Sequence, residues 1–140
     1  MANAALERNP DWFDGKVSGG LGTSTSPPPP AIQAIDVDDN GRIWVFVAVA
    51  ADTWREAWPG RARARREVRA QDMAYEKLYR TMVEVIDPTE GRVITRRTID
   101  QWVIAALPGR RIAAYTVDRD GIPQVEISQI ELVDDSRRSK

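Results

Sequence analysis

The sequence contains no histidine and no cysteine. Without cysteine the chain can form no disulfide and offers no thiol nucleophile, and without either residue it lacks the usual ligands of zinc. Hydrolysis by a Ser-His-Asp or a Cys-His arrangement is excluded, and no side chain titrates near neutral pH unless its pKa is shifted. We therefore expect a protein that is not an enzyme and that holds no metal and no cofactor.

An excess of charge and a long apolar run are also missing. The 20 Lys and Arg residues against 21 Asp and Glu residues leave a net charge of −1, so bulk electrostatics do not favour nucleic acid as a partner. No segment approaches the roughly 20 apolar residues of a membrane-spanning helix. Residues 1–14 carry four charged side chains where a signal peptide would have an apolar core. These features alone predict a cytoplasmic location.

The composition divides the 140 residues into an arm, one domain and a tail. Residues 1–30 are predicted to form an extended arm, because a Gly/Ser-rich stretch at 18–26 precedes four prolines at 27–30. Trp12 and Phe13 are the apolar residues that would anchor this arm. Residues 31–135 are predicted to form a β domain with an insertion at 52–79, and residues 136–140 form a polar tail.

From residue 31 onward, short apolar segments alternate with turn residues such as Asp39-Asn40-Gly41. Connections this short favour an antiparallel meander, so the predicted fold class is mainly β with about seven strands. In the last strand the alternation slips, which indicates either a bulge near Ser128-Gln129 or a change of partner. The strands are predicted at 35–37, 42–50, 81–86, 92–99, 102–107, 111–117 and 124–132.

The insertion at 52–79 is the exception to this pattern. Residues 65–79 lack Gly and Pro and predict a helix within a long loop. Loops of this length in a compact domain are usually functional. Either the insertion is a binding segment, or its arginines form a solvated helix face beside packing tryptophans. Its candidate partner-binding residues are Trp54, Trp58, Arg61, Arg65 and Arg69, the last three at i, i+4, i+8 spacing.

The segment 43–49 (IWVFVAV) carries no polar residue on either face of the predicted strand. Leaving one large side chain uncovered forfeits about 1.5–3 kcal/mol. The meander can cover one face of this strand, so the other face needs the insertion, a second copy or a different protein. This feature favours a binding role over a catalytic one.

Aspartate-rich turns suggest an alternative function. Residues 36–41 (DVDDNG) match the opening of a calcium loop, but loop position 12 is Val47 rather than glutamate, which excludes an EF-hand. Asp118, Asp120 and Gly121 repeat the theme. A small ligand- or calcium-binding module that uses these turns is the alternative hypothesis, and a plain hairpin turn is the simpler interpretation.

Three segments carry a family resemblance: residues 35–45 (IDVDDNGRIWV), residues 83–88 (VEVIDP) with Gly91-Arg92, and residues 107–127. They resemble blades and the closing segment of six-bladed, NHL-type bacterial β-propellers. The strands suffice for under two blades, so the resemblance implies a truncated remnant of about one and a half blades. Isolated repeat units leave their stacking faces open and need a cap. Such propellers are commonly exported, which implies the periplasm and leaves the location undecided.

These observations together predict a non-catalytic structural subunit that docks onto a larger protein assembly. Its partners would be other protein subunits, with peripheral contact to a membrane surface and no nucleic acid. The favoured setting is a membrane-extrinsic accessory subunit of a bacterial membrane complex, for example a photosynthetic reaction centre with its antenna.

Overall fold

The computed structural model describes residues 27–58 and 74–133. The described part is mainly β, which confirms the predicted fold class, and each predicted strand is present with boundaries that differ by a few residues. The strands are β1 (Ala31–Val37), β2 (Ile43–Ala50), β3 (Tyr79–Asp87), β4 (Arg92–Ile99), β5 (Trp102–Leu107), β6 (Arg111–Val117) and β7 (Pro123–Gln129).

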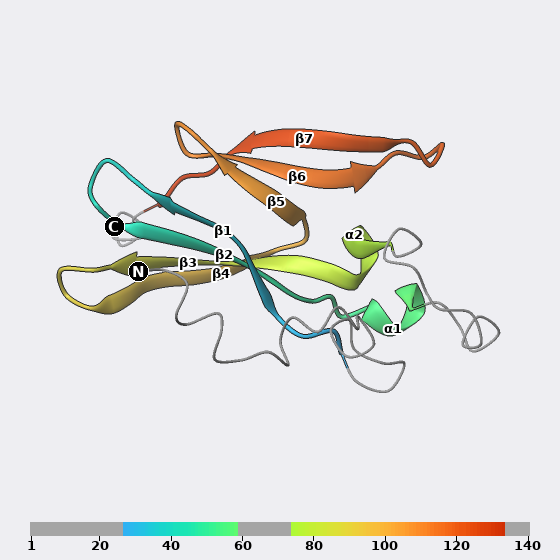
Figure 1. Ribbon diagram of the computed structural model, residues 1–140, viewed down its shortest axis with the longest axis horizontal. Helices are drawn as coiled ribbons and strands as arrows, with labels where there is room; N and C mark the ends of the chain where they lie inside the picture. Colours follow the sequence, from blue (N-terminus) through green and yellow to red (C-terminus); the bar gives the residue numbers. More distant parts are fainter. Residues whose placement is uncertain (1–26, 59–73, 134–140) are drawn as a thin grey trace, which may run out of the picture.

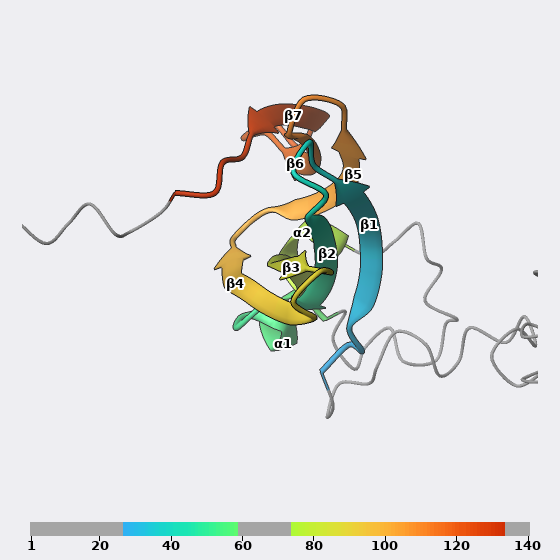
Figure 2. The same ribbon diagram turned by 90° about the vertical axis from the view of Figure 1, so that its left-hand side faces the viewer.

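The strands form two antiparallel sheets, in the orders β1-β2-β3-β4 and β5-β6-β7. The second sheet lies over one face of the first (Figure 1). Viewed from the side, β1 and β4 form the two edges of the first sheet (Figure 2). The single predicted meander is therefore divided between β4 and β5, where residues 100 and 101 carry the chain from one sheet to the other.

Of the two alternatives for the last strand, the bulge near Ser128-Gln129 is wrong. The β6–β7 pairing runs without a register shift from Arg111 opposite Gln129 to Val117 opposite Pro123. The strand ends at Gln129, and the Ile130 N–H then donates to the Arg110 carbonyl oxygen at 2.9 Å. Ending the strand, rather than bulging it, lets Ile130 and Leu132 pack against the core.

The main core lies between the two sheets. Trp44 and Phe46 of β2 stand opposite Val85 and Val83 of β3, so all four side chains share one face of the first sheet. They are buried in one cluster with two residues of the second sheet, Val103 and Ile112. The second sheet therefore covers one face of the apolar strand β2.

Thr81 fixes the second sheet to the first. Its side chain is fully buried, and its Oγ1 donates to the Gln101 carbonyl oxygen at 2.7 Å. The same oxygen accepts the Val103 N–H at 2.9 Å. Because both bonds reach the start of β5, this one hydroxyl positions the second sheet over the core face of β3.

Two short helices, α1 (Trp54–Ala57) and α2 (Tyr75–Leu78), lie at one end of the molecule (Figure 1). They pack in a second cluster with Ala48 of β2 and Tyr79 of β3. The helix predicted within 65–79 is described only from residue 74, where it covers Tyr75–Leu78. Within the described ranges, no helix is long and apolar enough to cross a membrane.

Candidate docking surface

The outer face of the first sheet, which points away from the second sheet, exposes the apolar side chains of β1. Ile32, Ile35 and Val37 are 64%, 59% and 60% exposed. They stand opposite Val47, Val45 and Ile43 of β2, and directly paired residues share one face of a sheet. The outer patch, as we call this surface, consists of Ile32, Ile35, Val37, Ile43, Val45, Val47, Met82, Ile86 and Val93.

Strand β1 is amphipathic, but its apolar side chains point away from the core, whereas those of an ordinary edge strand point toward it. Its apolar Ile35 and Val37 point outward, whereas Asp36 between them stands opposite the buried Trp44 on the core face. A strand of a two-layer fold normally turns its apolar residues toward the core. The inverted pattern indicates that the outer face of β1 is suited to a further layer.

Charge on the outer patch is locally balanced. Glu84 stands opposite Val45 on one side and Arg96 on the other, so both charged side chains lie on the outer face. They form an ion pair with each other. The patch therefore presents apolar side chains around one neutralised pair, which suits contact with an apolar partner surface rather than a highly charged one.

The second sheet has a smaller apolar surface of the same inverted kind. Val125 and Ile127 of the edge strand β7 are 56% and 51% exposed. They stand opposite Tyr115 and Ala113, while Glu126 between them lies on the same face as the buried Ala114. Both outward faces of the two-sheet stack are thus partly apolar.

Two of the sequence-predicted binding residues lie in the described part, and both pack against the chain itself. Trp54 is 8% exposed in the second cluster, and the Arg55 guanidinium lies 5.3 Å from the centre of its ring. Trp58 is half-buried against the same cluster. The remaining candidates, Trp12, Phe13, Arg61, Arg65 and Arg69, lie outside the described residues.

Sequence reasoning missed the residues of β1. The alternation of Ile35, Asp36 and Val37 predicted the strand but not the direction in which its apolar side chains point. A usable signal was present, because the neighbouring strand is apolar on both faces and each face needs cover. An amphipathic strand next to a two-sided apolar strand can present its apolar side chains on either face of the sheet.

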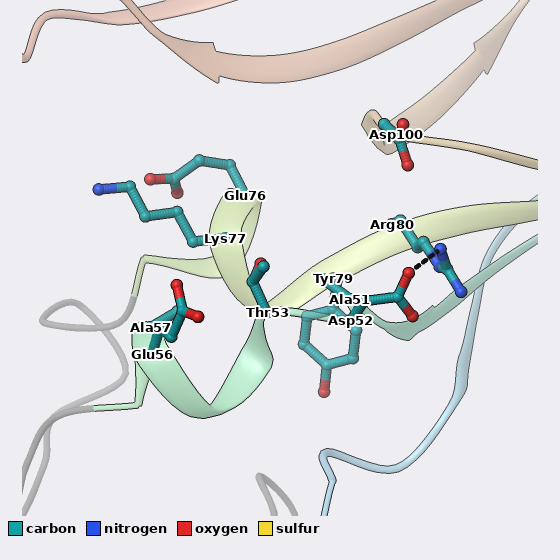
Figure 3. Close-up of a pocket in the computed structure, with 10 residues that line it drawn as sticks. All are labelled: Ala51, Asp52, Thr53, Glu56, Ala57, Glu76, Lys77, Tyr79, Arg80 and Asp100. Atoms are coloured by element: carbon teal, nitrogen blue, oxygen red, sulfur yellow. Dashed lines mark hydrogen bonds and ion pairs between the residues drawn. The ribbon is translucent and has the colours of Figure 1, made fainter.

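A polar cleft of about 590 Å³ lies beside the two helices (Figure 3). On one side of it, Arg80 forms an ion pair with Asp52 at 3.0 Å (Figure 3). Asp100 lies on the far side of the cleft from Glu56 (Figure 3). In the described ranges no group of three acidic side chains is placed to hold a metal ion. The charged side chains that line the cleft are Asp52, Glu56, Glu76, Lys77, Arg80 and Asp100.

In the first aspartate-rich turn, the carboxylate of Asp38 accepts hydrogen bonds that stabilise the hairpin. Asp38 Oδ1 accepts the N–H groups of Asn40 at 2.9 Å and Arg42 at 3.0 Å. Asp38 Oδ2 accepts the Trp44 Nε1–H at 3.0 Å. Desolvation on its own would raise the pKa of Asp38, but the bonds from Trp44, Arg42 and Asn40 outweigh it and lower the pKa below its usual value.

The second turn repeats this arrangement. Asp118 Oδ1 accepts the N–H groups of Asp120 and Ile122, each at 2.9 Å, and Oδ2 accepts the Gln124 Nε2–H at 3.0 Å. In both turns a glycine three residues after the aspartate has positive φ, 75° at Gly41 and 81° at Gly121. These carboxylates hold hairpins, so the geometry favours a structural role over ion binding.

Comparisons with known proteins do not assign this chain to a family. A scan against family models, a search of curated proteins and a search of solved structures each gave no match for this chain. The surfaces described above therefore carry the functional inference.

Proposed function

We propose that this chain is a non-catalytic β module that docks onto a larger protein assembly through the outer patch. The observation that carries the proposal is the exposure of Ile32, Ile35 and Val37, about three-fifths each, on the same face as the apolar side chains of β2. Contiguous exposed apolar surface on a small domain is typical of an interaction site.

The exposed area is large enough to matter for binding. Complete burial of an Ile or Val side chain contributes about 1.5–3 kcal/mol, so burying the exposed three-fifths contributes about 1–2 kcal/mol for each residue. The three β1 side chains together supply about 3–5 kcal/mol, before the half-buried residues of the patch are counted. Association costs about 4–15 kcal/mol, chiefly in lost translational and rotational freedom. The patch therefore supports docking when the partner contributes matching contacts.

The partner that fits best is another protein layer that presents an apolar sheet or helix face. Sheets pack face to face through their side chains, and the outer patch offers such a face with one neutral ion pair. A blade-like origin is proposed from the sequence resemblance of residues 35–45, 83–88 and 107–127, since antiparallel sheets and aspartate–glycine turns on their own occur in many β folds. The finer proposal of a membrane-extrinsic accessory subunit, such as one on a reaction centre with its antenna, rests on the propeller resemblance alone.

A substitution experiment with a matched control tests the docking proposal. The triple variant I32T/I35T/V37T keeps β-branched residues and removes the apolar surface of β1. The control I122T/V125T/I127T removes three side chains of similar exposure, 57%, 56% and 51%, from the other end of the stack. The measurements are self-association by sedimentation velocity and the fluorescence of a dye that binds apolar surface.

We expect the wild-type chain to associate or to bind the dye, the β1 variant to lose most of this behaviour and the control to keep it. A wild-type chain that stays a monodisperse monomer without dye binding would contradict the proposal. An equal effect of the two triple variants would also contradict it, because the outer patch would then have no special role.

A further inference from the structure

A separate cavity of about 310 Å³ opens between the edge strand β4 and the C-terminal segment 130–133. Trp44, Val83 and Val85 form its floor, and Ile99 and Leu132 form part of its walls. It lies on the core side of the first sheet, so it is distinct from the outer patch. Its volume is at the lower end of the range of small-molecule sites.

The floor of the cavity offers no polar group to a ligand. The valines carry none, and the one polar side-chain atom of Trp44, Nε1, already donates to Asp38. A polar ligand group on this floor would lose its hydrogen bonds to water without replacing them. The part of a ligand that lies on this floor is therefore apolar, such as an alkyl chain or a ring, whereas the hydroxyl of Thr95, which also lines the cavity, can contact a polar group of the ligand.

Arg97 supplies a cation at the same cavity. It stands opposite Val83, so it lies on the core face of β4, whereas its neighbour Arg96 lies on the outer face and is paired with Glu84. Within the described ranges Arg97 has neither an ion pair nor a side-chain hydrogen bond. An exposed guanidinium beside an apolar cavity is suited to bind a carboxylate with two parallel hydrogen bonds.

Glu131 also borders the cavity and limits the charge of the ligand. It is exposed and alternates with Ile130 and Leu132, which pack on the core. A carboxylate at this rim disfavours a multiply charged group such as a phosphate monoester. We propose that the cavity binds a singly charged carboxylate amphiphile, with its apolar chain over Trp44 and its carboxylate at Arg97.

Arg97 has a simpler explanation, since inward-pointing charges on edge strands prevent pairing with other chains. Calorimetric titration with decanoate, compared with the neutral decanol and below the onset of micelles, distinguishes the two roles. The matched variants are Arg97→Gln and Arg96→Gln, which remove adjacent charges on opposite faces of β4. Both positions are exposed on an edge strand, so a glutamine side chain fits at each without a steric clash, and urea denaturation of both variants checks that the loss of the Arg96–Glu84 ion pair leaves the fold intact.

We expect saturable decanoate binding that Arg97→Gln weakens about tenfold or more, as for the loss of one charge-assisted hydrogen bond. Decanol affinity should be the same in both variants, and Arg96→Gln should leave decanoate binding unchanged. The variant I32T/I35T/V37T should also retain decanoate binding, which separates the cavity from the outer patch. Absent decanoate binding, equal effects of the two arginine variants, or loss of binding in the β1 variant would each overturn the proposal.

Discussion

The two aspartate turns provide a sharp test of how this fold is held together, because they share a geometry and differ in one partner. Asp38 Oδ2 accepts from the indole of the core residue Trp44, whereas Asp118 Oδ2 accepts from the amide of Gln124 at the surface. In Asp38→Asn, one amide oxygen can still accept the two backbone N–H groups. The amide nitrogen then faces the Trp44 Nε1–H, so two donors meet and the indole loses its acceptor.

The expected cost follows from that lost bond. A hydrogen bond to a charged group contributes about 1.5–3 kcal/mol, and we expect Asp38→Asn to reduce the free energy of unfolding by about this amount. In Asp118→Asn the Gln124 amide can rotate and present its oxygen to the new NH₂ group. We therefore expect Asp118→Asn to be clearly the milder change.

The pH dependence adds a second, independent readout. The folded pKa of Asp38 lies below the usual value of 3.8. The stability that its carboxylate contributes is therefore fully present above the unfolded pKa and is lost as the pH falls through the lower folded pKa. The difference in unfolding free energy between wild type and Asp38→Asn should shrink over that acidic window.

Urea denaturation at several pH values, followed by tryptophan fluorescence, measures both effects. Equal destabilisation by Asp38→Asn and Asp118→Asn at neutral pH would refute the role given to the Trp44 bond. A difference between wild type and Asp38→Asn that stays constant down to the acid transition would refute the pKa assignment.

Three further predictions follow from the same packing. Thr81→Val should lower the free energy of unfolding by about 1–3 kcal/mol, because the buried Val103 N–H loses its acceptor; Thr81→Ser, which keeps the hydroxyl, should cost less in the same urea assay. Phe46→Ala should cost about 3–5 kcal/mol, because its side chain is 1% exposed in the main core, whereas the half-buried Val45→Ala should cost less. The pKa of Tyr79 is raised, mainly by burial and to a smaller extent by the nearby Tyr75. Ultraviolet titration should therefore show one tyrosine that ionises late, and Tyr79→Phe should remove that late step.

The strands could be predicted from the sequence because their signals are local. Period-two alternation and the turns at Asp39-Asn40-Gly41 and Asp120-Gly121 set where the chain reverses, and both glycines adopt the positive φ that such turns need. The division into two sheets could not be predicted, because the contacts between the sheets, such as those of Thr81 with the backbone of Gln101 and Val103, join residues about twenty positions apart.

The candidate surface could be predicted only in outline. An apolar run on both faces of β2 indicated that cover was needed, but it could not tell which face the second sheet would cover. That choice is set by long-range packing of Trp44 and Phe46 against Val103 and Ile112. The same packing places Ile35 and Val37 on the uncovered side, although their strand looks like an ordinary amphipathic one.

The most direct test of the docking account compares one side chain in isolation and in its native setting. Since the chain has no cysteine, Ile35→Cys and Arg119→Cys each introduce a unique thiol, one on the outer patch and one on an exposed turn. The measurement is the rate of alkylation of each thiol, both in the dilute purified chain and in intact cells of the source organism. The thiol at residue 119 calibrates how readily the reagent enters the cell. We predict that the residue 35 thiol reacts readily in the purified chain and is selectively protected in the cell. Equal relative reactivity of the two thiols in both settings would contradict the account.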